Sequence, residues 1–160
     1  EAYNTALSIN PNCADSYSNM GVALQFQGKF VKAIEAFMKA ISIKPDSAEA
    51  YNNMGFSLRS QGKLEEAIEA YNNALSIKPD YVDAYNNMGS ALQDQGKLEK
   101  AIETYNKALS LKPDFATVHR NLSAIKQYET GNPTPSMMGF LEKITLDDSS
   151  DEKEEKGYEI

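Results

Sequence analysis

Apolar residues recur along most of the chain at spacings of three, four and seven positions, which is the period of one face of an α-helix. The clearest of these positions in the first complete pair of stretches are Tyr17, Met20, Leu24, Ile34, Phe37 and Ile41. Each stretch is long enough for roughly three helical turns. The pattern therefore predicts pairs of amphipathic helices, here called helix A and helix B, that pack together as hairpins.

Turn-forming residues mark the expected helix ends. A glycine follows each helix A, where a left-handed C-cap is favoured, and a proline follows each helix B, which it ends. These residues are Gly28, Gly62 and Gly96, and Pro45, Pro79 and Pro113. Asp46, with Glu49 three residues later, predicts an N-cap for the next helix A. Small residues such as Gly21 and Ala33 are expected to let the two helices approach closely.

The whole helical pattern repeats every 34 residues. Residues 48–81 and 82–115 align without a gap and are about two thirds identical. The period predicts helix B of an incomplete upstream repeat at 1–13, complete repeats at 14–47, 48–81 and 82–115, a degenerate final hairpin with a capping helix at 116–145, and an acidic C-terminal segment at 146–160.

The pattern within each repeat resembles the tetratricopeptide repeat. In residues 48–81 the positions that carry this resemblance are Tyr51, Met54, Gly55, Leu58, Gly62, Ala67, Tyr71, Ala74 and Pro79. The resemblance implies an all-α fold, a right-handed superhelix of antiparallel helical hairpins, in which the A helices line a concave groove. It also implies a protein-protein interaction scaffold that binds an extended peptide segment in that groove.

The family's geometry places a defined set of side chains in the expected groove. The candidate peptide contacts are Asn19, Val22, Asn52, Asn53, Phe56, Arg59, Asn86, Asn87, Gln93, Arg120 and Asn121. An asparagine recurs at one position of every repeat, and a carboxamide can pair with both the C=O and the N–H of a peptide. This row is similar to the asparagine ladder of the O-linked N-acetylglucosamine transferases. Hydrogen bonding between helices is the alternative role for these asparagines, and covering a neighbouring helix is the alternative for Phe56.

Charge narrows the class of partner. The net charge is -7, but residues 147–160 contain seven carboxylates and two lysines, so the body before them is nearly neutral. Proteins that bind nucleic acids or anionic membranes have a concentrated basic face. A nearly neutral body offers no such face, which argues against both as partners. The family's geometry places Asp15, Glu49 and Asp83 at the groove edge, where family members that clamp a terminal carboxylate are expected to have, in one repeat, a lysine. We therefore expect a neutral or basic extended segment as the partner, and poor binding of acidic tails.

Residues for catalysis are scarce. His119 and Cys13 are the single histidine and the single cysteine, and they are too far apart in sequence to suggest a dyad. His119 aligns with Tyr51 and is expected to pack between helices. We predict no enzyme activity, no cofactor and no metal site. The lone cysteine suggests a reducing, cytoplasmic setting, and no apolar run is long enough for a membrane span.

Two alternative functions arise from the ends of the chain. Residues 119–133 resemble the segment that closes the repeats in bacterial tetratricopeptide-repeat/sulfotransferase proteins, which implies an accessory substrate-recruiting domain of a larger sulfotransferase or glycosyltransferase. At the other end, helix B of residues 1–13 has no helix A of its own. Its apolar edge predicts self-association, and hence a self-assembly scaffold.

Overall fold

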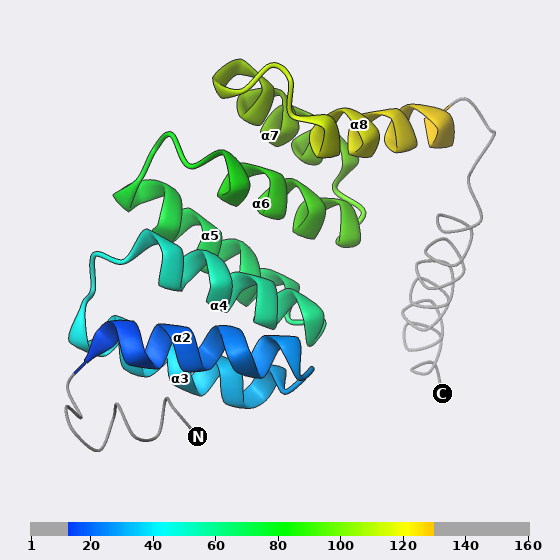
Figure 1. Cartoon of the computed structure of the whole chain (residues 1–160). Coiled ribbons are helices and arrows are strands. Elements are labelled where there is room, and N and C mark those ends of the chain that lie inside the picture. Colours follow the sequence, from blue (N-terminus) through cyan, green and yellow to red (C-terminus); the bar gives the residue numbers. More distant parts are fainter. Residues whose placement is uncertain (1–12, 130–160) are drawn as a thin grey trace, which may run out of the picture. The chain divides into compact units, whose positions relative to one another are not determined.

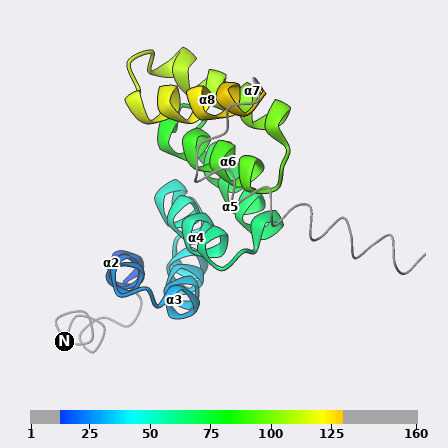
Figure 2. The ribbon, with the colours of Figure 1, turned by 90° about the vertical axis from the view of Figure 1, so that its right-hand side faces the viewer.

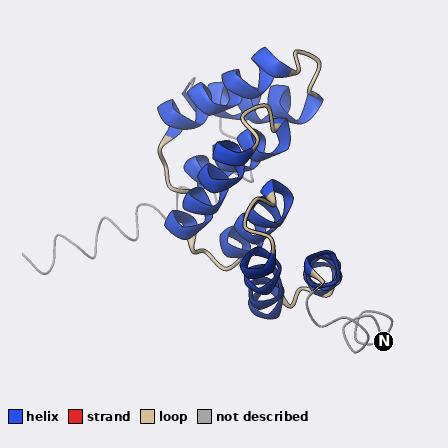
Figure 3. Ribbon diagram, turned by 90° about the vertical axis from the view of Figure 1, so that its left-hand side faces the viewer, coloured by secondary structure: helices blue, strands red, loops and turns tan. Residues whose placement is uncertain are grey.

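The computed structural model describes residues 13–129, which form seven α-helices and no strand (Figure 1 and Figure 3). The helices are α2 (Ala14–Phe26), α3 (Phe30–Ile43), α4 (Ala48–Ser60), α5 (Leu64–Ile77), α6 (Val82–Asp94), α7 (Leu98–Leu111) and α8 (Ala116–Glu129). The predicted all-α fold is confirmed. Every helix in these residues is too short or too polar to cross a membrane.

The first six helices form three hairpins that follow one another in chain order (Figure 2). Within each hairpin, helix A (α2, α4 or α6) packs on its helix B (α3, α5 or α7). Each helix B also packs on the next helix A, as α3 does on α4 and α5 on α6, and consecutive A helices touch. This arrangement places equivalent faces of the A helices side by side.

Small residues on the B helices form the centre of the core. Three equivalent positions of the repeats are almost fully buried, and all hold alanine except Thr104 in the third repeat: Ala33, Ala36, Ala40, Ala67, Ala70, Ala74, Ala101 and Ala108. Because alanine loses no rotamer freedom on burial and adds little volume, it lets neighbouring helices pack closely. Leu58 and Tyr71 extend one such cluster toward Ala91 of α6, so the core is continuous from one hairpin to the next.

A glycine of each helix A lies directly against an aromatic ring of its helix B. An added Cβ would approach ring atoms to 2.6 Å at Gly21 with Phe37, at Gly55 with Tyr71, and at Gly89 with Tyr105. All three rings are completely buried. The predicted close approach at Gly21 is confirmed, and its physical cause is the ring that occupies the space of the missing side chain.

The turns confirm that a glycine follows each helix A and that a proline follows each helix B. They also show that Asp46 is not the N-cap of α4. Gly28, Gly62 and Gly96 have φ angles of 69°, 75° and 75°, and the amide of Lys29 donates to the carbonyl of Leu24, closing the left-handed C-cap. The N-cap of α4 is Ser47, whose hydroxyl accepts from the amide of Ala50 at 3.3 Å. Asp46 lies one residue too early, so its predicted capping role is wrong.

The last described helix, α8, belongs to a separate compact unit that begins at Ala116. Val118 and Ile125 are fully buried. His119 is exposed, so the prediction that it packs between helices is wrong. Residues 1–12 and 130–160 are not described, and the expectations for the upstream helix B, the capping helix and the acidic segment fall there.

Replacing Gly55 with alanine should destabilise the protein by about 1–3 kcal/mol, because the buried ring of Tyr71 has no space to move away from the new methyl group. Urea unfolding followed by circular dichroism measures the change. Ser76→Ala on the exposed side of α5 is the matched control and should change stability by less than about 0.5 kcal/mol.

A double-mutant cycle tests the stated cause. In a Tyr71→Leu background the ring is absent, so Gly55→Ala should cost distinctly less than it does in the parent chain. An equal cost in both backgrounds would mean that the glycine is needed for a reason other than the ring.

Candidate functional site

A row of polar and apolar side chains runs along the A helices of the three hairpins. We call it the A-helix face and define it by Asn19, Val22, Asn53, Phe56, Asn87 and Ser90, two from each of α2, α4 and α6. Asn19 and Phe56 are exposed, and the other four are half-buried. The predicted asparagines of these three helices therefore lie on adjacent helices with solvent access.

Asn52 has a supporting position beneath this row. It is only 6% exposed, and its Oδ1 accepts a hydrogen bond of 3.0 Å from Nδ2 of Asn87 on the next A helix. Its own Nδ2 makes a long contact of 3.5 Å to Oδ1 of Asn53. Asn52 therefore joins α4 to α6, and its burial leaves it little surface for a ligand.

Asn19 and Asn53 keep their amide donors unused. Nδ2 of each residue has no hydrogen-bond acceptor within residues 13–129. Gln25 of α2 instead reaches the backbone carbonyl of Asn53 at 2.7 Å and the hydroxyl of Ser57 at 2.8 Å, and so links α2 to α4. These contacts hold Asn53 in place without occupying its side-chain N–H groups.

The single arginine of the three hairpins is paired. Arg59 of α4 donates from Nε to Asp94 of α6, and about a third of each side chain is exposed. Partial burial disfavours the guanidinium charge, but the hydrogen bond and the charge of Asp94 more than offset this and raise the pKa of Arg59 above its ordinary value. The sequence indicated Arg59 as a positive contact for ligands, whereas its charge is balanced by Asp94.

Behind the A-helix face, two equivalent tyrosines differ in their hydrogen bonding. The hydroxyl of Tyr105 lies 3.0 Å from that of Ser90 and donates to Oε1 of Gln93 at 3.2 Å. The hydroxyl of Tyr71 is buried without a hydrogen-bond partner in the described part of the chain. The reason is visible one repeat earlier, where Phe56 occupies the position equivalent to Ser90 and offers no polar atom. Burial strongly raises the pKa of Tyr71.

One carboxylate lies in the first turn of each of the helices α2, α4 and α6. Asp15, Glu49 and Asp83 are all exposed in the first helical turn, where they favour the positive end of the helix dipole. Burial, followed by the charges of Glu49 and Asp83, raises the pKa of Tyr81. The N-terminal edge of the A-helix face is therefore electronegative.

Aromatic side chains supply the apolar part of the face. Phe56 is 43% exposed, and its ring meets that of Phe30 edge to face at a centroid distance of 6.4 Å. Phe26, at the end of α2, is 89% exposed. Phe56 therefore packs on a neighbouring helix, which is one of the two roles considered from the sequence, and the other role, a contact with a ligand, stays a prediction.

The remaining predicted contacts lie elsewhere or have other partners. Gln93 accepts from Tyr105, and Asn86 contacts Asn87 at 3.5 Å. Arg120 is exposed and Asn121 is half-buried on α8, in the other compact unit. Across the described ranges, no group of three or more His, Cys, Asp or Glu side chains is arranged to hold a metal ion.

The sequence reasoning missed Asp94 as part of this site. Its signal is a spacing slightly longer than one repeat: Arg59 and Asp94 are 35 residues apart, as are Asn52 and Asn87. A charged pair at that offset indicates two side chains on the same face of consecutive A helices.

Comparison with sequence families gives one consistent result. Models described as tetratricopeptide repeat match residues 14–47, 82–115 and 36–69, and a further one described as TPR repeat matches residues 57–96. The matches together span the three hairpins. A search of curated proteins found no match.

Solved structures with a similar fold include proteins with bound peptides. The crystal structure of MamA is 26% identical, with 95% of this chain and 88% of that chain covered and a TM-score of 0.74. The first TPR of Spaghetti (RPAP3), bound to the HSP90 peptide SRMEEVD, is 26% identical over 73% of this chain and 93% of that chain, with a TM-score of 0.70. The second TPR domain of human RPAP3, in complex with the HSP70 peptide SGPTIEEVD, is 27% identical over 71% and 94%, with a TM-score of 0.68.

Removing the hydroxyl should lower the stability of the protein at Tyr105 but not at Tyr71. Tyr105→Phe should destabilise the protein by about 1 kcal/mol, because it deletes the hydrogen bonds to Ser90 and Gln93. Tyr71→Phe should leave stability unchanged or raise it by up to about 1 kcal/mol, since it removes a buried hydroxyl that lacks a partner. Thermal and urea unfolding of both variants provide the comparison, and equal destabilisation by the two would contradict the assignment.

Proposed function

The chain belongs to the tetratricopeptide repeat family, and on this premise we propose that it is a protein-interaction scaffold whose A-helix face binds an extended segment of another protein. The observation that carries the proposal is the row formed by Asn19, Asn53 and Asn87. Two of these three side chains have amide donors with no acceptor in the part of the chain that the structure describes.

An extended peptide suits this row for geometric and chemical reasons. Its backbone offers a C=O and an N–H at every residue, whatever its side chains, and a carboxamide can pair with either group. Asn52 orients Asn87 from beneath, so that side chain need not become ordered when the peptide binds. The exposed ring of Phe56 adds an apolar contact for one peptide side chain.

The charges of the face support a neutral or basic segment as the partner. Asp15, Glu49 and Asp83 are exposed along its N-terminal edge, and the guanidinium of Arg59 is balanced by Asp94. An acidic peptide would therefore meet net repulsion, whereas a lysine or arginine of the partner could pair with an exposed carboxylate. The two RPAP3 domains bind peptides that end in acidic residues, SRMEEVD and SGPTIEEVD, whereas we propose a neutral or basic partner for this chain.

The other predictions made from the sequence are not tested by the described part of the chain. Self-association through the upstream helix B concerns residues 1–12. Recruitment of substrate for a sulfotransferase or glycosyltransferase rests partly on residues beyond Glu129. A cytoplasmic location rests on the lone Cys13. All three stay predictions.

Alanine substitution of Asn19 and Asn53 should weaken peptide binding about tenfold, because each loses a hydrogen bond to the peptide backbone. A library of random 12-residue peptides, screened on the immobilised intact chain, supplies the ligands, and calorimetry measures their dissociation constants. Neither residue supports another helix through its side-chain donor, so the unfolding midpoint should hardly change.

The matched control removes two carboxamides from the B helices instead. Asn73 and Asn106 are both exposed, on α5 and α7, and the Asn73→Ala/Asn106→Ala variant should bind the selected peptides as tightly as the parent chain. Weaker binding by the control, or unchanged binding by the A-helix variant, would count against the proposal.

The peptide SRMEEVD should bind the intact chain more weakly than a neutral peptide of equal length. The substitution Asp94→Asn should strengthen the binding of SRMEEVD about two- to fivefold. The reason is that the amide keeps a hydrogen-bond acceptor for Arg59 while releasing its positive charge. Glu99→Gln, which makes the same charge change at an exposed site on α7, is the control and should have little effect. Fluorescence anisotropy at low salt measures all four affinities.

A further inference from the structure

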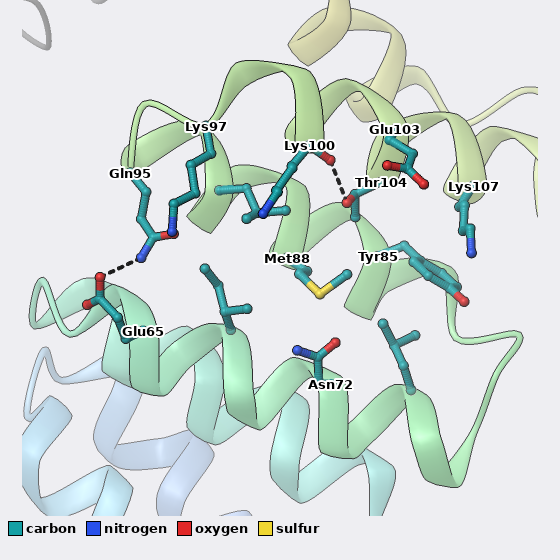
Figure 4. A pocket seen from close by; sticks show the side chains of 13 residues that line it. Glu65, Asn72, Tyr85, Met88, Gln95, Lys97, Lys100, Glu103, Thr104 and Lys107 are labelled. Atoms are coloured by element: carbon teal, nitrogen blue, oxygen red, sulfur yellow. Dashed lines mark hydrogen bonds between the residues drawn. The ribbon is translucent and has the colours of Figure 1, made fainter.

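A groove of about 620 Å³ lies between the B helices α5 and α7, and we call it the α5–α7 groove (Figure 4). Its lining residues come from α5, α6, α7 and the turn between α6 and α7, so it belongs to the second and third hairpins of one compact unit. None of the residues that define the A-helix face lines it. The groove is therefore a second surface, separate from the one proposed above to bind an extended segment.

The floor of the groove is apolar. It consists of Ile68 and Leu75 of α5 and of Met88 and Leu92 of α6. Ile68 and Met88 also pack against the core cluster around Tyr71, which holds the floor in place. Leu92 is buried, whereas the other three floor residues are half-buried and retain surface. A ligand with apolar side chains would remove this surface from water, which is favourable.

One wall of the groove is basic. Lys97, Lys100 and Lys107 line it from the α7 side, all three are exposed, and their amino groups extend toward α5 in Figure 4. None of the three forms an ion pair with another residue that the structure describes. Two carboxylates, Glu65 and Glu103, also line the groove, so its lining keeps a positive balance.

The corresponding groove one repeat earlier, between α3 and α5, provides an internal comparison. Each of its eight lining residues lies 34 positions before a lining residue of the α5–α7 groove. Its volume is about 270 Å³, whereas the α5–α7 groove falls within the roughly 300–1,000 Å³ that is usual for binding clefts. At the eight shared positions the earlier groove has a net charge of -2, from Glu66 and Glu69. The α5–α7 groove has +1 there, from Lys100, Lys107 and Glu103.

One difference between the repeats leaves two of these lysines without a carboxylate beside them. In the second repeat Lys63 forms an ion pair of 3.7 Å with Glu66, three residues later. In the third repeat Lys97 and Lys100 stand at these two positions. Two like charges thus replace an ion pair, and they repel each other. A carboxylate from a partner would relieve this repulsion and form charge-assisted hydrogen bonds.

The spacing of these groups indicates the shape of the ligand. Ile68 and Leu75 are seven residues apart on α5, and Lys100 and Lys107 are seven residues apart on α7. Seven residues are two helical turns, about 10 Å. A helical partner meets this spacing with apolar residues at i, i+4 and i+7 and carboxylates beside them. An extended strand fits poorly, because three residues of it also span about 10 Å but place the two side chains on opposite faces.

We propose that the α5–α7 groove binds an acidic amphipathic helix of another protein, with the apolar stripe of that helix on the floor and its carboxylates against Lys97, Lys100 and Lys107. A nucleic acid is a poorer match, since it would leave the apolar floor uncovered and meet only three lysines. The A-helix face stays open in this arrangement. The chain can therefore hold an extended segment and a helix at the same time, on two different surfaces.

A titration of the isotope-labelled intact chain with a synthetic helical peptide tests the proposal. The peptide has leucine at positions i, i+4 and i+7 and glutamate on both flanks of this stripe, and nuclear magnetic resonance follows its binding. The amides of residues 97–107 and the methyl group of Met88 should shift, while the side-chain amides of Asn19 and Asn53 should not. No shifts in the groove, or shifts confined to the A-helix face, would overturn the proposal.

Two matched peptides separate the contributions of charge and apolar surface. Replacing every glutamate of the probe with glutamine should weaken its binding about tenfold, because the charge-assisted contacts to the lysines are lost. Replacing every leucine with serine should abolish measurable binding, since the floor then stays in contact with water. Equal binding of all three peptides would show a non-specific contact and contradict the proposal.

Charge reversal in the protein identifies the groove. Lys100→Glu/Lys107→Glu should weaken binding of the acidic peptide at least about tenfold, and so should raising the salt concentration for the parent chain. Lys29→Glu/Lys44→Glu makes the same change in net charge at exposed sites of the first hairpin, and it should bind the peptide nearly as tightly as the parent chain. An equal loss of affinity in the two variants would mean that net charge, and not the groove, attracts the peptide.

Two further measurements distinguish other occupants of the groove. Sedimentation velocity of the intact chain without peptide should show no self-association that Lys100→Glu/Lys107→Glu abolishes. Such an association would show that the groove binds a second copy of this chain, which would overturn the proposal. A single-stranded oligonucleotide should bind more weakly than the acidic peptide, and tighter binding would equally contradict the assignment of a protein helix.

Discussion

The structure depends on one close contact, made once in each hairpin, between a glycine of helix A and an aromatic ring of helix B. At Gly21, Gly55 and Gly89 a single added carbon would lie 2.6 Å from a buried ring. The contact fixes the separation of the two helices and the side of helix A that turns inward. The opposite side is then available for other contacts. The same geometric requirement thus produces both the core and the A-helix face.

Side-chain contacts between successive A helices connect the parts of this face. Asn87 with Asn52 and Arg59 with Asp94 connect α4 to α6, and Gln25 connects α2 to α4. These bonds consume buried or charged groups and leave the amide donors of Asn19 and Asn53 unused. The face is therefore held rigid by some of its polar groups while others stay open to a ligand. Such preorganisation lowers the entropic cost of binding.

The sequence predicted the features that depend on local interactions. Helix periodicity, the left-handed glycines and the prolines after helix B follow from the chain within a few residues, and all are present in the described hairpins. The N-cap prediction for Asp46 failed by one residue because Ser47 offers a hydroxyl at the position where α4 begins. The partner of Arg59 could not be predicted from one repeat alone, since it depends on how consecutive repeats are rotated.

The central claim is that the row of asparagines contacts a peptide backbone. The most direct measurement is a nuclear magnetic resonance titration of the isotope-labelled intact chain with a library-selected peptide, following the side-chain NH₂ signals of asparagine. The account predicts the largest shifts at Asn19, Asn53 and Asn87, with Asn73 and Asn106 of the B helices unchanged. Shifts confined to the B helices, or absent from the side chains of Asn19 and Asn53, would contradict it.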